Sequence, residues 1–215
     1  MAALTVVAGH THLISGSYGR IALDSFFVLS AFLLTGPLLT NIGASGWVTT
    51  FYLRRGARIW PLYYAVAAWC IFTSVPNQVR PAWPLLFQLD LVEAGIAGDH
   101  ARRSALGVLW TVGTEEKFYV LLPLLLWATI RFSGAHRVPA VMLGSAALSI
   151  AARVLTQAPV PRIVMFHTRF DAVAFGAVAA WLARSRPHWG RFAVLPAVGF
   201  LAGAFVMSDH LVQFA

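Results

Sequence analysis

The sequence predicts an all-α protein: a polytopic bundle of about seven transmembrane helices, forming a single membrane-embedded domain over residues 1–215. The first reason is composition, because 59% of the residues are hydrophobic and only 11% are charged. An average soluble domain has roughly 25% charged residues. The second reason is that the apolar residues form long runs without a polar face, which disfavours the amphipathic helices of a soluble core. We therefore expect a multi-pass protein of the cell membrane that contacts membrane lipids.

The predicted spans are apolar runs, most of them close to the ~20 residues that cross a hydrocarbon core of ~30 Å. In chain order they are Met1–Ile14, which is short, then Ile21–Thr40, Ile59–Val79, Ala105–Ile130, Val138–Ala158, Thr168–Ala183 and Phe192–Ser208. Pro61 is expected in the first turn of its helix, where its missing N–H is tolerated. Pro123 lies deep in the fourth span and is expected to kink it.

Basic residues outnumber acidic ones by 16 to 8, which gives a formal charge of +8. They interrupt apolar runs instead of clustering on a polar domain, a pattern that favours membrane loops and sites for anionic ligands. No nucleic-acid partner is therefore expected. If the chain enters the membrane from the cytoplasm, the loops that stay inside contain arginines and no acidic residue; they are Asn41–Arg58, Arg131–Arg137 and Arg184–Arg191. The positive-inside rule therefore predicts this orientation.

Ionisable side chains inside a bilayer are costly, so those within the predicted spans are candidates for function. His10 could be a general base, because imidazole titrates near neutral pH; a buried structural histidine is the alternative. Glu115 could orient His10 and stabilise the imidazolium; the alternative is a structural ion pair, for instance with Arg169. Successive helical residues point about 100° apart, so Glu116 cannot face the same cavity, whereas Tyr119 shares the face of Glu115.

Three arginines, Arg54, Arg55 and Arg58, precede the third span at its predicted cytoplasmic boundary. Arg58 can share a helical face with either neighbour. Guanidinium groups bind phosphates bidentately, which suits the polyphosphate part of a cytoplasmic nucleotide donor. Ordinary positive-inside anchoring at the membrane surface is the alternative interpretation.

Three further charged residues lie near the outer ends of their predicted spans. We expect Asp24 to cap its helix, with an interaction with Arg20 as the alternative. Arg169 and Asp171 are expected to form an ion pair that reaches the interface and fixes the helix end, and a second role is left open. No metal is expected, because the two histidines of the first span do not share a helix face.

Five segments, in this order, resemble the acyltransferase 3 family: VVAGHTH, ALDSFFVLSAFLLT, FYLRRGARIWPLYY, LWTVGTEEKFY and RFDAVAFGAVAAWLA. The resemblance implies an integral membrane enzyme that moves an acetyl or other short acyl group from acyl-CoA to a hydroxyl of a glycan, lipid or macrolide-type acceptor. Acyl-CoA is then a donor substrate, and no bound cofactor is implied. The family usually has about ten spans, so the resemblance implies that this chain holds an incomplete acyltransferase domain.

The resemblance also implies roles for individual residues. The essential histidine of the family falls on His10, the glutamate of its E-x-x-F-Y motif falls on Glu115, and its donor-binding arginines fall on Arg55 and Arg58. Its late Arg-x-Asp motif begins at Arg169. Two alternatives to an active enzyme are an inactive truncated acyltransferase and a non-enzymatic membrane transporter. A transporter should show repeated halves with interrupted helices, and the sequence shows no such repeat.

Overall fold

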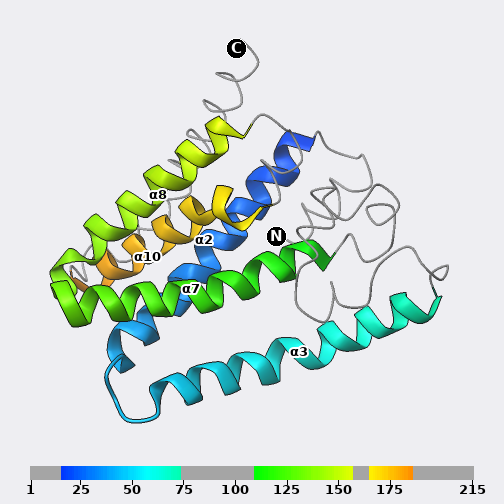
Figure 1. Cartoon of the computed structure of the whole chain (residues 1–215), viewed down its shortest axis with the longest axis horizontal. Helices are drawn as coiled ribbons and strands as arrows, with labels where there is room; N and C mark the ends of the chain where they lie inside the picture. The colour runs from blue at the N-terminus through cyan, green and yellow to red at the C-terminus, as the bar shows by residue number, and fades with distance from the viewer. Residues whose placement is uncertain (1–15, 74–108, 157–164, 186–215) are drawn as a thin grey trace. The chain divides into compact units, whose positions relative to one another are not determined.

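The computed structural model describes residues 16–73, 109–156 and 165–185, and almost all of them are helical (Figure 1). The α-helices are α2 (Gly16–Asn41), α3 (Trp47–Thr73), α7 (Trp110–Ser133), α8 (Val138–Leu155) and α10 (Phe170–Ser185). Two short 3₁₀ turns, η2 (Ala135–Arg137) and η3 (Phe166–Thr168), precede α8 and α10. The described ranges contain no strand, so the expectation of an all-α protein is confirmed for them.

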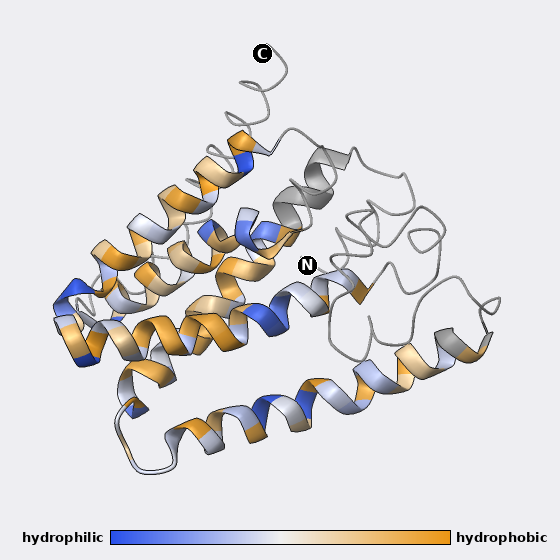
Figure 2. Cartoon of the chain, viewed as in Figure 1, coloured by the Kyte–Doolittle hydropathy of each residue, from blue (hydrophilic) through white to orange (hydrophobic). Residues whose placement is uncertain are grey.

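Two helical segments within the described ranges are long and apolar enough to cross a membrane: Leu23–Asn41 and Ala135–Leu155. They correspond to the predicted spans Ile21–Thr40 and Val138–Ala158. Apolar residues cover most of the length of α8 in Figure 2. The predicted spans at the two ends of the chain lie outside the described residues, and a total of about seven spans stays a prediction.

Helix α3 begins earlier than expected, at Trp47. The predicted loop Asn41–Arg58 is therefore mostly helical, and Pro61 lies well inside the helix rather than in its first turn. The turn before α3 contains two glycines with positive φ, Gly43 (φ 94°) and Gly46 (φ 71°). The boundary prediction was wrong because it followed hydropathy, which falls at the arginines, whereas arginine is a good helix former.

The described helices belong to two compact units. The first unit comprises α2 up to Thr40, α7 from Pro123 onwards, α8, and α10 together with Arg169. Helix α10 packs on α8. The indole N–H of Trp181 donates to the carbonyl of Ala135 (3.0 Å), while residues near the start of α10 contact the end of α8. The two helices are therefore antiparallel.

Helix α10 also packs along α2. Three contacts follow one another in the order Asp24 with Arg169, Val28 with Gly176, and Thr40 with Arg184. Because the residue numbers rise together on both helices, α2 and α10 run parallel. The first and last of these contacts lie sixteen positions apart on α2, at Asp24 and Thr40, which is roughly 24 Å of helix.

Gly176 sets the distance between α2 and α10. A Cβ atom at this position would overlap the carbonyl oxygen of Val28 and would lie 2.9 Å from the Cβ of Ala31. We expect Gly176→Ala to lower the free energy of unfolding by about 1–3 kcal/mol, because the backbones must separate. Gly144→Ala on α8 is the matched control, since nothing lies within 4 Å of its added Cβ.

This control should raise stability by about 0.5–1 kcal/mol, since alanine favours a helix over glycine. Thermal unfolding of the two purified variants in detergent measures the difference. Equal melting temperatures for the two variants would contradict the close approach of α10 to α2.

The second unit comprises α3, the part of α7 up to Leu122, and η3. The hydroxyl of Tyr52 donates to the carbonyl of Tyr119 (3.4 Å), and the indole of Trp60, further along α3, bonds to Glu116. Residue numbers rise on α3 as they fall on α7, so these helices are antiparallel. Helix α7 contributes its first half to this unit and its second half to the other.

Candidate functional site

A chain of three polar side chains links α3 to α7 in the second unit. Arg55 donates from Nη1 to the hydroxyl of Tyr119 (3.5 Å), and that hydroxyl donates to Oε1 of Glu115 (2.5 Å). The guanidinium carbon of Arg55 also lies 4.6 Å from the centre of the Tyr119 ring. Glu115 and Tyr119 are buried, whereas Arg55 is partly exposed. Arg55 is thus held by a buried phenol and, through it, by a carboxylate.

The spacing of the two acids explains their different surroundings. Tyr119 follows Glu115 by four residues and therefore shares its face of α7, as the sequence predicts. Glu116 points elsewhere, and its Oε2 accepts a hydrogen bond from the indole N–H of Trp60 (3.3 Å). Partial burial raises the pKa of Tyr52, which precedes the predicted span on α3, so this phenol remains a proton donor near neutral pH.

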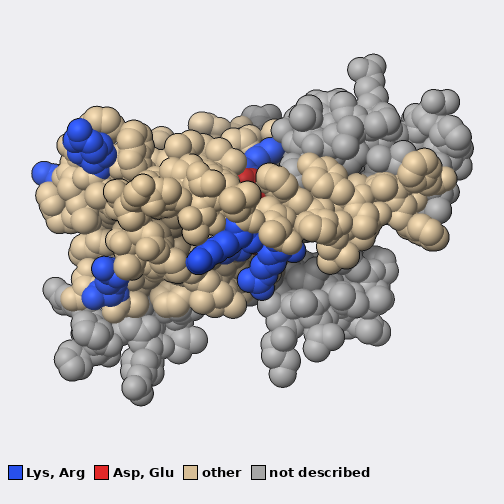
Figure 3. All heavy atoms as spheres, turned by 90° about the horizontal axis from the view of Figure 1, so that it is seen from below, with Lys and Arg blue, Asp and Glu red and all other residues tan. Residues whose placement is uncertain are grey.

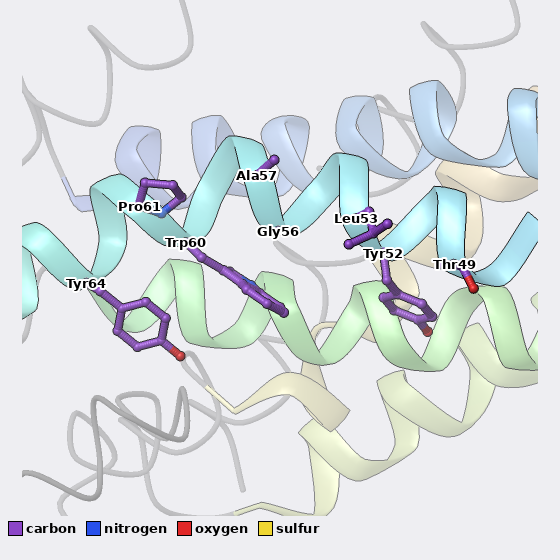
Figure 4. A pocket seen from close by; sticks show the side chains of 8 residues that line it. All are labelled: Thr49, Tyr52, Leu53, Gly56, Ala57, Trp60, Pro61 and Tyr64. Atoms are coloured by element: carbon purple, nitrogen blue, oxygen red, sulfur yellow. The ribbon is translucent and has the colours of Figure 1, made fainter.

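A groove of about 530 Å³ runs along α3 in the same unit (Figure 4). Its walls are mostly apolar and aromatic, and they consist of Thr49, Tyr52, Leu53, Gly56, Ala57, Trp60, Pro61 and Tyr64. The Trp60 ring lies over Gly56, since a Cβ added there would be 3.1 Å from the ring. The absence of a side chain at Gly56 therefore leaves room for the indole that Glu116 holds.

Arg54 and Arg58 differ from Arg55 in their surroundings. Both are exposed, and their four-residue spacing places them on one side of α3. Charged side chains visible on the face in Figure 3 are almost all basic. Of the three arginines on α3, Arg55 is therefore fixed against α7, whereas the side chains of Arg54 and Arg58 are exposed.

The first unit contains two buried ion pairs. Arg169 bonds through Nη1 to Oδ1 of Asp24, joining α10 to α2. Arg153 on α8 bonds through Nη2 to Oδ1 of Asp171 on α10 (2.5 Å). The hydroxyl of Ser149 lies 3.4 Å from the same carboxylate oxygen. Relative exposures of 0% for Arg169, 1% for Asp171 and 2% for Arg153 show that these charges are fully inside the unit.

Two expectations about these charges are corrected. Asp24 does not cap its helix, because α2 begins at Gly16, eight residues earlier. Arg169 and Asp171 do not form an interfacial ion pair with each other. Arg169 pairs with Asp24 on α2, and Asp171 pairs with Arg153 on α8. The reason is local geometry: Arg169 directly precedes α10, and residues two apart at a helix start point to different sides. Glu115, the carboxylate suggested as an alternative partner of Arg169, accepts the Tyr119 hydroxyl through Oε1.

Of the predicted site residues, the structure brings together Arg55, Glu115 and Tyr119 in one unit and Asp24, Arg169 and Asp171 in the other. His10 lies outside the described residues. Sequence reasoning missed Arg153 and Trp60. Arg153 lies inside the apolar span Val138–Ala158, so the cost of an intramembrane charge was the signal that could have found it.

Comparison with known proteins identifies the family of the chain. A family model described as an acyltransferase domain matches residues 1–215, which confirms the resemblance to acyltransferase 3 proteins. An uncharacterized protein of Haemophilus influenzae is 30% identical over 118 residues, covering 48% of each chain. The peptidoglycan O-acetyltransferase OatA of Listeria monocytogenes is 26% identical over 150 residues, covering 61% of this chain and 24% of that protein. No solved structure matches.

The chain thus spans about half of the length of the first relative and about a quarter of the second.

Proposed function

The chain belongs to the acyltransferase 3 family, and we propose that it transfers an acetyl or other short acyl group from acyl-CoA to a hydroxyl group. The proposed acceptor is a glycan, a lipid or a macrolide-type natural product. A glycan is the preferred class, because one relative is named a peptidoglycan O-acetyltransferase. We propose that the chain crosses the cell membrane several times. The arginines before Ile59 then lie at the cytoplasmic side.

The observation that supports the donor is the fixed position of Arg55. A guanidinium held by Tyr119 and partly exposed has N–H groups left to point at a phosphate, with less side-chain entropy to lose on binding. Arg58 adds an exposed positive charge one turn away on the same helix. We assign Arg55 and Arg58 to the phosphates of coenzyme A, with Arg54 as a neighbour that raises the local positive potential.

The proposed chemistry is direct transfer. The acceptor hydroxyl oxygen attacks the thioester carbonyl carbon, the new C–O bond forms, and the C–S bond breaks. His10 takes the hydroxyl proton, which then passes to the departing coenzyme A thiolate. A thioester is already an activated acyl donor, so the protein supplies mainly positioning and base catalysis.

Glu115 has a second proposed role besides orienting His10. Its carboxylate accepts the Tyr119 hydroxyl, and that contact fixes the phenol against Arg55. Glu115 therefore acts as a positioning residue for the donor arginine. A carboxylate that is linked to Arg55 through one phenol also balances part of the positive charge when no donor is bound.

Transfer of labelled acetyl groups from acetyl-CoA tests this proposal, with membranes that contain this chain and isolated peptidoglycan as the acceptor. We expect His10→Ala to reduce transfer by about 10²–10⁴-fold, the usual contribution of a general base. The amount of protein in the membrane should not change. Arg131→Gln is the control, because Arg131 is exposed and lies outside the second unit.

Equal transfer by the His10→Ala and unaltered proteins would remove His10 from the reaction. Transfer absent from the unaltered chain with peptidoglycan, lipid and macrolide acceptors alike would favour the alternative that residues 1–215 alone do not catalyse acyl transfer.

A further inference from the structure

A second pocket, of about 640 Å³, lies in the first unit where α7 ends and α8 begins. It is lined by Ser133, His136, Arg137, Ala140 and Val141. Three of these residues have polar side chains that can donate hydrogen bonds, and the lining contains no acidic residue. His136 and Arg137 are both exposed. The pocket therefore suits an anionic group such as a phosphate.

The pocket coincides with the end of a candidate membrane span. The apolar segment Ala135–Leu155 begins within the pocket itself. If this segment crosses the bilayer, its first turn lies at the level of the lipid headgroups. The adjacent Arg131 is also exposed, so the positive charge extends beyond the pocket. This is the depth at which anionic phospholipids present their phosphates.

An apolar stripe continues from the pocket along α8. Val141, Gly144, Leu148 and Leu155 follow Arg137 at successive intervals of four, three, four and seven residues, so they share one face of the helix. Leu148 is 74% exposed and Leu155 is 79% exposed. A Cβ added at Gly144 would meet nothing within 4 Å, so the stripe has an open notch between its larger side chains.

The opposite face of α8 packs inside the unit. Its buried residues are Val138, Met142, Ala146, Ser149 and Arg153. The exposed stripe is thus separate from the side that carries the ion pair with Asp171. A ligand on the stripe would leave the packing of the unit unchanged.

We propose that this pocket and stripe bind an anionic phospholipid, with the phosphate at Arg137, His136 and Ser133 and one acyl chain along α8. The basic groups lie at the start of α8 and the apolar stripe follows them along the helix. A phospholipid has the same arrangement, with a charged headgroup followed by an apolar chain. The site rests on the proposed membrane location but not on the proposed acyl transfer, since none of its residues belongs to the donor or catalytic groups.

Native mass spectrometry of the delipidated full chain in detergent, titrated with phosphatidylglycerol, tests the proposal. We expect Arg137→Gln to weaken phosphatidylglycerol binding about tenfold, because the phosphate loses a charge-assisted hydrogen bond to the guanidinium. Arg131→Gln is the matched control, because it removes the same charge from the last turn of α7, near the pocket but outside its lining. It should weaken binding less than twofold. Phosphatidylcholine should bind more weakly to the unaltered protein and respond little to either variant.

Three outcomes would overturn the proposal. Equal losses in Arg137→Gln and Arg131→Gln would indicate general attraction of the anionic lipid to the basic residues around the pocket. Full competition by millimolar inorganic phosphate would indicate a phosphate site that does not use the acyl chain. Crosslinking between two copies through Leu148→Cys, without phosphatidylglycerol binding, would show that the stripe is covered by a second copy of this chain.

Discussion

Replacing Arg153 by methionine is expected to lower the free energy of unfolding by about 3–5 kcal/mol, one of the largest effects of any single substitution in this chain. The substitution removes the guanidinium that lies 2.5 Å from Asp171 and leaves the carboxylate inside the first unit. Asp171 is only 1% exposed, so water cannot replace the lost partner without opening the unit. Asp171→Leu should also destabilise the protein, because Arg153 loses its ion pair with Asp171 inside the unit.

The double variant Arg153→Met/Asp171→Leu is the decisive control. Both charges are then absent, and two apolar side chains of similar size fill the space between α8 and α10, so most of the stability should return. Melting temperatures of the purified variants in detergent measure this. A double variant that melts as low as the singles, or lower, would show that the pair is not a mutually compensating buried contact.

Replacing Tyr119 by phenylalanine is expected to lower kcat/KM for acetyl-CoA about tenfold, because Arg55 loses the hydroxyl that fixes it. The ring remains, so the contact of the guanidinium with its face is kept and the buried volume barely changes. The loss should appear mainly in KM for the donor. Acetyl transfer at varied acetyl-CoA concentration, with saturating acceptor, separates KM from kcat.

Glu115→Gln provides the graded comparison. An amide oxygen still accepts the Tyr119 hydroxyl but has no charge, so the donor KM should rise by less than in Tyr119→Phe. A loss in kcat alone, with an unchanged donor KM in both variants, would contradict the positioning role. It would instead favour a direct role of Glu115 beside His10.

Much of the helical framework follows from the sequence. The apolar runs at Ile21–Thr40 and Val138–Ala158 correspond to α2 and α8. A run of this length that is apolar on all faces is typical of a buried or membrane-spanning helix. The start of α3 could not be predicted from hydropathy, because Trp47 to Arg58 is a polar extension of an apolar helix. Hydropathy marks where a helix is apolar, not where it begins.

The site could be predicted only where the relevant contacts are local. The link between Glu115 and Tyr119 follows from their four-residue spacing on one helix. The partner of Asp24 is 145 residues away, and the partner of Asp171 is on a neighbouring helix. Such pairs depend on which helices pack together, and Gly176 shows that this choice depends on backbone contacts that no periodic pattern indicates.

Equilibrium binding of labelled acetyl-CoA to the purified chain tests the central claim, that α3 holds the donor through Arg55. We predict that Arg55→Gln weakens binding about 10–100-fold, the range for losing hydrogen bonds between a charged donor and a phosphate. Arg131→Gln, which removes the same charge from an exposed position outside the second unit, should bind as the unaltered protein does. Equal affinity of the Arg55→Gln and Arg131→Gln variants would contradict the account.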